Sequence, residues 1–225
     1  EVAKTKYRGS KTADSLPFHA DRCDIVGLLC VRKARSGGLS RITSAAAIHN
    51  EILRLRPDLL EVFYADWHHS RQGDEAPGES RTYPKPIFSF CGEHFTGLFS
   101  TNYINFAQEY AEVPRITQRQ REALELFGKL ADELALDMTF EPGDIQLLNN
   151  HLIYHSRTRY DDYAEKDRKR LLLRLWLAVP GSRPLPRSYE LVFGNTEAGA
   201  VRGGVPSRDG WRTVTELRAR KTVTK

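Results

Sequence analysis

The sequence is poor in cysteine, and its few cysteines are not arranged in pairs. Among 225 residues there are three, at Cys23, Cys30 and Cys91. This odd number, without close spacing, is unlike the disulfide framework of a small secreted domain. We therefore expect free thiols in a reducing, cytoplasmic setting, where the three side chains act as small buried hydrophobic groups.

Long apolar runs are also missing. No stretch approaches the roughly 18 apolar residues of a membrane-spanning helix, and residues 1–15 lack the apolar core of a signal peptide. The composition, 40% hydrophobic and 28% charged, is that of an ordinary globular protein. We expect no membrane partner and one domain over 1–225, with a polar, basic tail at 206–225.

A strong charge of one sign is absent as well. The formal net charge is +5, and the basic residues are spread along the chain without a block of like charges. The footprint of a nucleic-acid-binding protein is therefore weak, although that class stays as a rival hypothesis that predicts steeply salt-dependent DNA binding. A small acidic substrate fits the mild positive charge equally well.

The patterns that are present predict short strands interleaved with a few helices. The expected elements are a strand at 25–34, helices at 44–56, 57–65 and 117–135, a hairpin at 87–100 and strands within 138–155. We expect Ser44 to cap the first helix, and Thr117 with Gln120 to form a capping box. Because regular strand–helix–strand alternation is missing, the pattern favours an antiparallel sandwich or barrel with helices outside.

A further strand is expected over 169–177, KRLLLRLWL, which alternates with a period of two. Arg170 and Arg174 fall on one face with Trp176, and leucines fill the other face. Since both faces are rich in apolar residues, we expect both to be buried. An isolated buried charge costs several kcal/mol or more, so the two arginines need either protein carboxylates or a bound anion.

A metal site can be assembled from three residues. His19 and Asp21 share a face if their segment is extended, and His155 ends an apolar run far downstream. Two histidines and a carboxylate on one side of a metal are the geometry of non-haem Fe(II) oxygenases, with open positions on the other side. The HxD pair alone is a weak signal, because a hydrogen-bonded loop histidine explains His19 as well. A downstream arginine that could hold a metal-chelating dicarboxylate strengthens the case.

With these residues in view, the chain resembles the TauD/TfdA family of Fe(II)- and 2-oxoglutarate-dependent dioxygenases, close to its clavaminate-synthase-like branch. The pieces that carry the resemblance occur in family order: LPFHADRCD, SGGLSRITSA, GDIQLLNNHLIYHSRTRYDD and KRLLLRLWL. The resemblance implies a double-stranded β-helix, a jelly-roll relative of the cupins, with flanking helices. This agrees with the antiparallel pattern, which does not by itself specify that topology.

The resemblance also implies residue roles. His19, Asp21 and His155 would be the iron ligands, with no catalytic side chain beyond them. Three further residues would bind 2-oxoglutarate: Ser40 by a hydrogen bond, Arg174 at the C5 carboxylate and Arg170 near the C1 carboxylate. Because Asp21 is present, the halogenase variant, in which a small residue replaces the carboxylate, is disfavoured.

One departure concerns the N-terminal side. Family members usually carry a substantial region ahead of the HxD, whereas 18 residues precede it here. We expect the chain to lack that region, and with it an edge of the core sheet.

The implied activity is hydroxylation of a small molecule with release of succinate and CO2. Our candidate substrate contacts are His68, in a long polar segment at 66–86 that is typical of a lid, and Tyr103 and Asn105, after the hairpin. Arg202 is expected to be exposed. The alternative is a non-catalytic jelly-roll binding module that keeps the fold without the activity.

Overall fold

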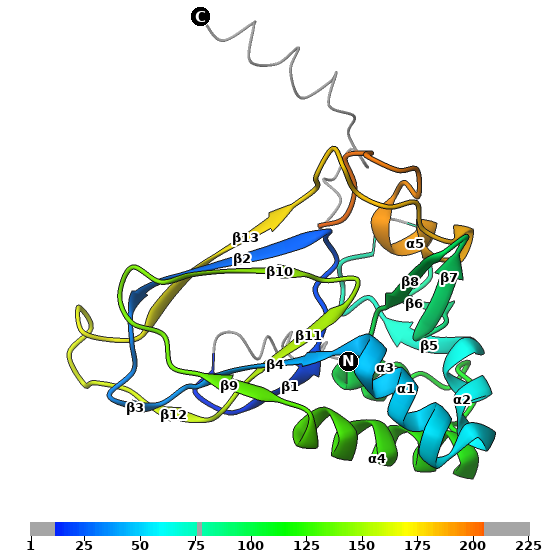
Figure 1. The fold of residues 1–225 in the computed structure, drawn as a ribbon, viewed down its shortest axis with the longest axis horizontal. Helices are drawn as coiled ribbons and strands as arrows, with labels where there is room; N and C mark the ends of the chain where they lie inside the picture. Colours follow the sequence, from blue (N-terminus) through cyan, green and yellow to red (C-terminus); the bar gives the residue numbers. More distant parts are fainter. Residues whose placement is uncertain (1–11, 76–77, 205–225) are drawn as a thin grey trace, which may run out of the picture.

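The computed structural model describes residues 12–75 and 78–204. Two antiparallel sheets face each other and form the jelly-roll core (Figure 1). One sheet has the strand order β1-β11-β4-β9, which are Leu16–His19, Ile153–Arg157, Ser40–Ser44 and Leu136–Met138. The other has the order β10-β2-β13, which are Ile145–Asn149, Ile25–Arg32 and Leu171–Leu177. Strands far apart in sequence are thus neighbours, as the double-stranded β-helix requires.

Three smaller strand pairs and several helices complete the described part of the chain. The pairs are β3 with β12 (Ser36–Gly37, Tyr160–Asp161), β5 with β6 (Trp67–Ser70, Thr82–Lys85) and β7 with β8 (Phe88–Cys91, His94–Gly97). The helices are α1 Ala45–Leu55, α2 Pro57–Tyr64, α3 Thr101–Ala107, α4 Gln118–Glu133 and α5 Glu190–Phe193, with a 3-10 turn at Arg187–Tyr189. None of the described helices is long and apolar enough to cross a membrane.

The helix signals in the sequence are confirmed. Ser44 accepts a hydrogen bond from the amide of Ala47 at the start of α1. At the start of α4, Thr117 and Gln120 form the reciprocal capping box, which satisfies two amides that the helix leaves free. Both helices pack against β4, so local caps and tertiary contacts agree.

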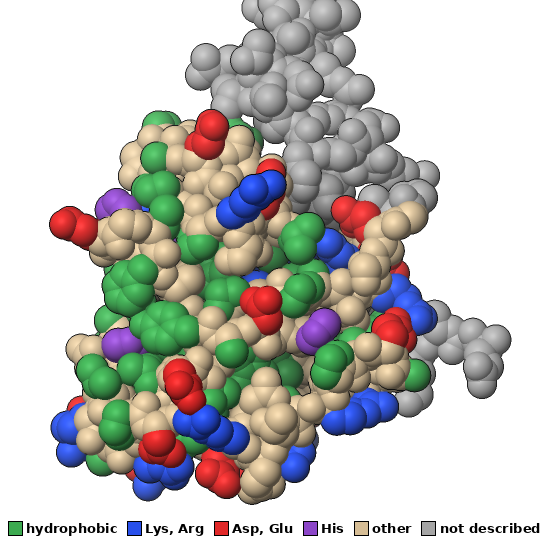
Figure 2. Space-filling model, turned by 90° about the vertical axis from the view of Figure 1, so that its right-hand side faces the viewer, with side chains coloured by type: hydrophobic (Ala, Val, Ile, Leu, Met, Phe, Trp, Pro, Cys, Tyr) green, Lys and Arg blue, Asp and Glu red, His purple; other side chains and the backbone are tan. Residues whose placement is uncertain are grey.

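The helices lie beside the four-stranded sheet and at one end of the molecule (Figure 1). The face that carries α2 and the β7–β8 hairpin shows acidic and basic side chains interspersed with apolar ones (Figure 2). The core beneath is aromatic: Phe63, Phe88, Phe99, Phe127 and Tyr154 are buried and in mutual ring contact. Tyr154 belongs to β11 and directly precedes His155, so this core supports the predicted metal site.

Two predictions about the strands are wrong. The segment at 66–86 is not an extended loop, because β5 and β6 pair within it. The leucine face of β13 is not buried, since Leu173 and Leu175 are 51% and 64% exposed. Ile145 and Leu147 on β10 lie on the same outer face and are 68% and 63% exposed. In the part of the chain that is described, nothing covers this face. The expected tail at 206–225 lies outside the described residues.

Candidate metal centre

The fold brings the three predicted ligands together. Strands β1 and β11 are antiparallel neighbours, and His19 is directly opposite His155 in their register. Asp21 follows two residues beyond the end of β1. One ligand atom from each of the three residues lies within 4.8 Å of the others, and the two imidazole ring centres are 4.3 Å apart. The strand pairing thus closes the long sequence distance between the HxD pair and His155.

The orientation of the rings suits a metal. The Nε2 atoms of His19 and His155 each lie 3.9 Å from an oxygen of Asp21, so both point toward the carboxylate. The Nδ1 atom of His19 lies 2.9 Å from the carbonyl of Pro17. A carbonyl only accepts, so Nδ1 carries the proton and Nε2 keeps its lone pair for a metal.

Charge favours the ligating forms of these groups. Burial alone raises the pKa of Asp21, but His155, His19 and Arg174 outweigh it together with a hydrogen bond from Trp176, so the pKa is lowered. Burial, with the nearby charges of His19 and Arg174, lowers the pKa of His155 to about 3. A carboxylate and a neutral imidazole are the forms that bind a divalent cation. The donor set therefore fits Fe(II).

A cavity of about 230 Å3 is lined by two of the three ligands, His19 and His155. Its lining includes the apolar side chains of Leu28, Phe140 and Leu172. The remaining lining residues include His19, His155, Ser40, Arg157, Tyr160, Arg170 and Arg174. An apolar cleft with a few convergent polar groups is the usual form of a small-molecule site.

Arg174 on β13 and Arg170, which directly precedes that strand, both line this cavity. One guanidinium nitrogen of Arg174 lies 3.2 and 3.0 Å from the two oxygens of Asp21, which places Arg174 beside this ligand. Arg170 precedes Arg174 by four residues, so about 13 Å of strand separates their backbones. Its side chain packs against Gly38 and lies over the ring of Tyr160, 5.2 Å from the ring centre. A Cβ atom on Gly38 would lie only 3.3 Å from its Nε.

The expectation that both arginines are fully buried is wrong. The Arg174 side chain is 38% exposed, and its anion is the protein's own Asp21. Arg170 is half-buried, and its guanidinium makes no ion pair within residues 12–75 and 78–204. Burial and the neighbouring charge of Arg157 lower the pKa of Arg170. Of the two, Arg170 is therefore the arginine that still requires an anion.

Ser40 lies at the start of β4, two residues after Gly38, and lines the same cavity. Its side chain is buried, and its hydroxyl lies 3.3 Å from the side-chain oxygen of Gln146. Ser40 therefore follows by two residues the glycine that contacts Arg170, and both Ser40 and Arg170 line this cavity.

The structure does not bring the predicted substrate residues to this cavity. His68 is half-buried on β5, and Asn105 is exposed on α3. Tyr103 lines a separate cavity of about 10 Å3, together with Ala20 and Arg22. Because Ala20 and Arg22 alternate with the ligands His19 and Asp21, this small cavity lies on the other side of that segment.

Sequence reasoning missed two contacts. The pattern favours a core role for Trp176, yet its indole N–H donates to Asp21 at 2.7 Å. Its place on the arginine face of β13 is the signal that could have revealed this. Arg202, expected to be exposed, is 4% exposed and forms an ion pair with Asp24. No local pattern indicates that pair, because the two residues are far apart in sequence.

Comparisons with known proteins agree with this geometry. A family model described as "Taurine catabolism dioxygenase TauD, TfdA family" matches residues 1–176. FR-33289 synthase of Streptomyces rubellomurinus (strain ATCC 31215) is 36% identical over 189 residues, which cover 80% of this chain and 55% of that protein. The chain thus spans about half the length of this relative.

Solved structures share the fold at low sequence identity. An asparagine oxygenase, solved with Fe(II), 2S,3S-3-hydroxyasparagine and succinate, has a TM-score of 0.58 and 18% identity, covering 73% of this chain and 50% of that one. The non-heme iron oxygenase OrfP, solved with Fe and alpha-ketoglutaric acid, has a TM-score of 0.54 and 15% identity, covering 73% and 49%. These likenesses establish the jelly-roll fold.

Proposed function

Because the chain belongs to the TauD/TfdA family of dioxygenases, we propose that it is an Fe(II)- and 2-oxoglutarate-dependent oxygenase that hydroxylates a small molecule. The observation that carries the proposal is the convergence of His19, Asp21 and His155, two of which line a cavity that also holds Arg170, an arginine with no ion pair among the described residues. Solved relatives of the same fold contain iron with 2-oxoglutarate or succinate, which supports the same cofactors here.

Each residue then has a defined task. His19, Asp21 and His155 would hold the iron. When bound, iron and 2-oxoglutarate supply the oxidising chemistry, in which O2-dependent decarboxylation of the 2-oxo acid to succinate and CO2 is coupled to hydroxylation. The apolar walls of the cavity exclude water from the co-substrate, and the indole of Trp176 keeps the Asp21 carboxylate oriented.

For the co-substrate we propose the reverse of the arginine assignment that the resemblance suggested. Arg170 and Ser40 would bind the distal C5 carboxylate, because both line the cavity, Arg170 contacts Gly38 two residues before Ser40, and Arg170 has no ion pair within the described residues. Arg174 would lie near the C1 end, because it already contacts Asp21. A guanidinium binds a carboxylate by two parallel hydrogen bonds, which fits either end chemically, so geometry decides between them.

The substrate is proposed to be small and anionic. Arg174 is partly exposed beside Asp21 and provides a cation for an acidic substrate group.

A cytoplasmic location is proposed as well, since Cys23, Cys30 and Cys91 are all free thiols. The face shown in Figure 2 carries acidic and basic side chains side by side, so this face has no continuous basic surface for nucleic acid.

An anaerobic titration tests the proposal. Apoprotein with Fe(II) and 2-oxoglutarate should develop the weak visible charge-transfer band of the chelate, and His155→Ala should abolish it. His94→Ala is the matched control, because His94 is exposed on β8. Absence of the band from folded protein would refute the assignment.

Admission of O2 then separates the enzyme from the binding module. Succinate release supports the oxygenase, whereas a band without succinate, in the presence of a broad panel of small acidic substrates, supports the non-catalytic alternative.

A further inference from the structure

The third ligand, Asp21, is not held by the sheet that holds the two histidines. The register of β1 with β11 ends at the pair His19 and His155, so Asp21 lies past the last strand pair. Two hydrogen bonds fix its backbone instead. Ala20 donates its amide to the carbonyl of Phe99 at 2.9 Å, and Asp21 donates its amide to the side-chain oxygen of Asn150 at 3.3 Å.

Asn150 makes two further hydrogen bonds to the segment that carries this ligand. Its side-chain nitrogen lies 2.9 Å from the sulfur of Cys23, and its own amide donates to the carbonyl of Asp24 at 3.0 Å. Asn150 is 1% exposed and lies on the turn between β10 and β11. The turn that leads into the His155 strand is therefore tied directly to the segment of Asp21.

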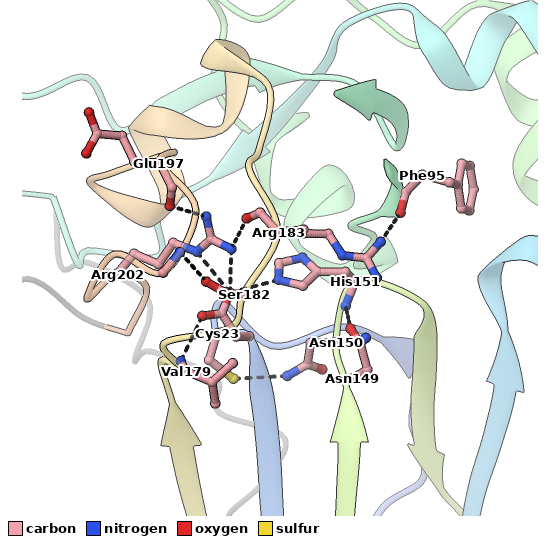
Figure 3. A network of polar contacts seen from close by, with 12 residues as sticks. Cys23, Phe95, Asn149, Asn150, His151, Val179, Ser182, Arg183, Glu197 and Arg202 are labelled. Atoms are coloured by element: carbon pink, nitrogen blue, oxygen red, sulfur yellow. Dashed lines mark hydrogen bonds and ion pairs between the residues drawn. The ribbon is translucent and has the colours of Figure 1, made fainter. Parts of the chain in front are cut away.

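A buried charge network closes on the same segment (Figure 3). One oxygen of Asp24 receives the Nε2 of His151 at 2.9 Å and the guanidinium of Arg202 at 2.8 Å, while the other receives the amide of Val179 at 3.2 Å. Asp24, His151 and Arg202 are each at most 4% exposed. Arg202 also donates to the carbonyl of Arg183 at 2.6 Å, and this second hydrogen bond fixes the orientation of its guanidinium.

We propose that Asn150 and Arg202 are positioning residues for the metal centre. Asn150 holds the amide of Asp21 directly, and Arg202 acts through Asp24 on the segment that Asn150 grips. The proposal rests on the proposed function, because it assigns Asp21 as a metal ligand. Arg202 lies beyond residue 176, where the match to the family model ends.

The structure offers a matched pair of substitutions at Asn150. Asn150→Leu removes both side-chain hydrogen bonds at similar volume, whereas Cys23→Ala removes only the contact with sulfur and leaves the bond to Asp21. Loss of a group that orients a ligand weakens metal binding by about 10- to 100-fold. We expect Asn150→Leu to raise the Kd for Co(II) by that factor, and Cys23→Ala to leave it unchanged.

Arg202→Lys tests the connection through Asp24. It also provides an independent test if the Asn150→Leu variant does not fold. It keeps the charge and loses the forked hydrogen bonds to Asp24. Its control is Arg71→Lys, because Arg71 donates to the carbonyl of Leu191 and so holds the same C-terminal segment without touching Asp24. We expect weaker Co(II) binding and an altered visible Co(II) spectrum for Arg202→Lys only.

The readout is Co(II) titration of apoprotein, with the thermal midpoint of each variant measured in parallel. A purely structural role predicts that Co(II) affinity stays at the wild-type value in every folded variant, and that result would overturn the proposal while leaving the proposed function intact. Wild-type protein that binds no Co(II) would overturn both.

Discussion

Arg174 contacts both carboxylate oxygens of Asp21 through one guanidinium nitrogen, at 3.2 and 3.0 Å. The carboxylate is therefore at once a prospective metal ligand and half of an ion pair. The pair helps to keep the pKa of Asp21 lowered despite burial, so the ligand is ionised at neutral pH. It also places a permanent positive charge beside the metal position, where an anionic oxygen of co-substrate or substrate would approach.

Substitution Trp176→Phe should weaken metal binding. The change keeps an aromatic side chain and removes the indole N–H that donates to Asp21 at 2.7 Å, so the carboxylate loses an orienting contact. We expect the Kd for Co(II) to rise by about tenfold. Trp67→Phe is the control, since Trp67 donates to the carbonyl of Val62 in the core. Equal Kd values for both variants would show that the indole does not orient the ligand.

Substitution Arg170→Met should weaken 2-oxoglutarate binding with little change in metal affinity. A hydrogen-bonded charge of this kind contributes about 1.5–3 kcal/mol, which corresponds to roughly 10- to 150-fold in affinity. The measurement is anaerobic titration of the Fe(II) protein with 2-oxoglutarate. Arg168→Met is the control, because that side chain is 54% exposed and pairs with Glu165. Loss of binding in Arg174→Met but not in Arg170→Met would restore the assignment made from the resemblance.

Lys85 should make stability depend on pH. Burial lowers the pKa of Lys85 from 10.5 to about 7, and its ammonium group lies 2.5 Å from the carbonyl of Leu98. Between these two pH values the unfolded chain binds a proton that the folded chain does not. Stability from this group is therefore full above pH 10.5 and is lost as the pH falls toward 7, by at most about 1.4 kcal/mol per pH unit.

Urea unfolding at several pH values between about 7 and 10 measures this slope. Lys85→Met should lack the contribution, and Lys129→Met, at a side chain that is 69% exposed, should retain it. Parallel stability profiles for wild type and Lys85→Met would contradict the prediction.

Two glycines should respond to alanine in opposite directions. A Cβ atom on Gly97 would overlap the hydroxyl of Tyr154 and lie 2.8 Å from the Cβ of Ala45, and both neighbours are fully buried. Overpacking of this kind costs about 1–3 kcal/mol. Gly128 lies inside α4, and a Cβ atom added there would meet nothing within 4 Å, so alanine should stabilise by about 1 kcal/mol. Thermal unfolding of both variants would check the signs, and a stabilised Gly97→Ala would contradict the packing argument.

Local signals in the sequence predicted α1, α2 and α4, whereas the short helices α3 and α5 were not predicted. Ser44 and Thr117 are followed by the residues that complete their caps, so the information lies within a few positions. Of the core strands, the one at 169–177 was found from its period of two, and those at 25–34 and within 138–155 from their apolar runs, whereas β1 and β4 were not predicted. Their pairing came from the family resemblance, because alternation does not say which strands are neighbours.

The site was predictable only in part, for physical reasons. His19, Asp21 and His155 stand in a recognisable pattern. Arg202, by contrast, meets Asp24 across 178 positions, and nothing near either residue marks the contact. The turn at Asn150 was missed because apolar residues flank it on both sides, so the run resembles one strand. The two arginines were distinguished only when the fold placed one of them beside Asp21.

The sheet β10-β2-β13 places Arg174 at the cavity and exposes Leu147, Leu173 and Leu175 on its other face. Hydrating apolar surface is unfavourable by about 25 cal/mol per Å2, so this wall retains free energy that burial would release. Anything that binds the leucine face of the folded chain, and not the unfolded chain, raises the free energy of unfolding by mass action. The free energy of unfolding of this chain alone in water is therefore a lower bound for its value in any assembly that covers the leucine face.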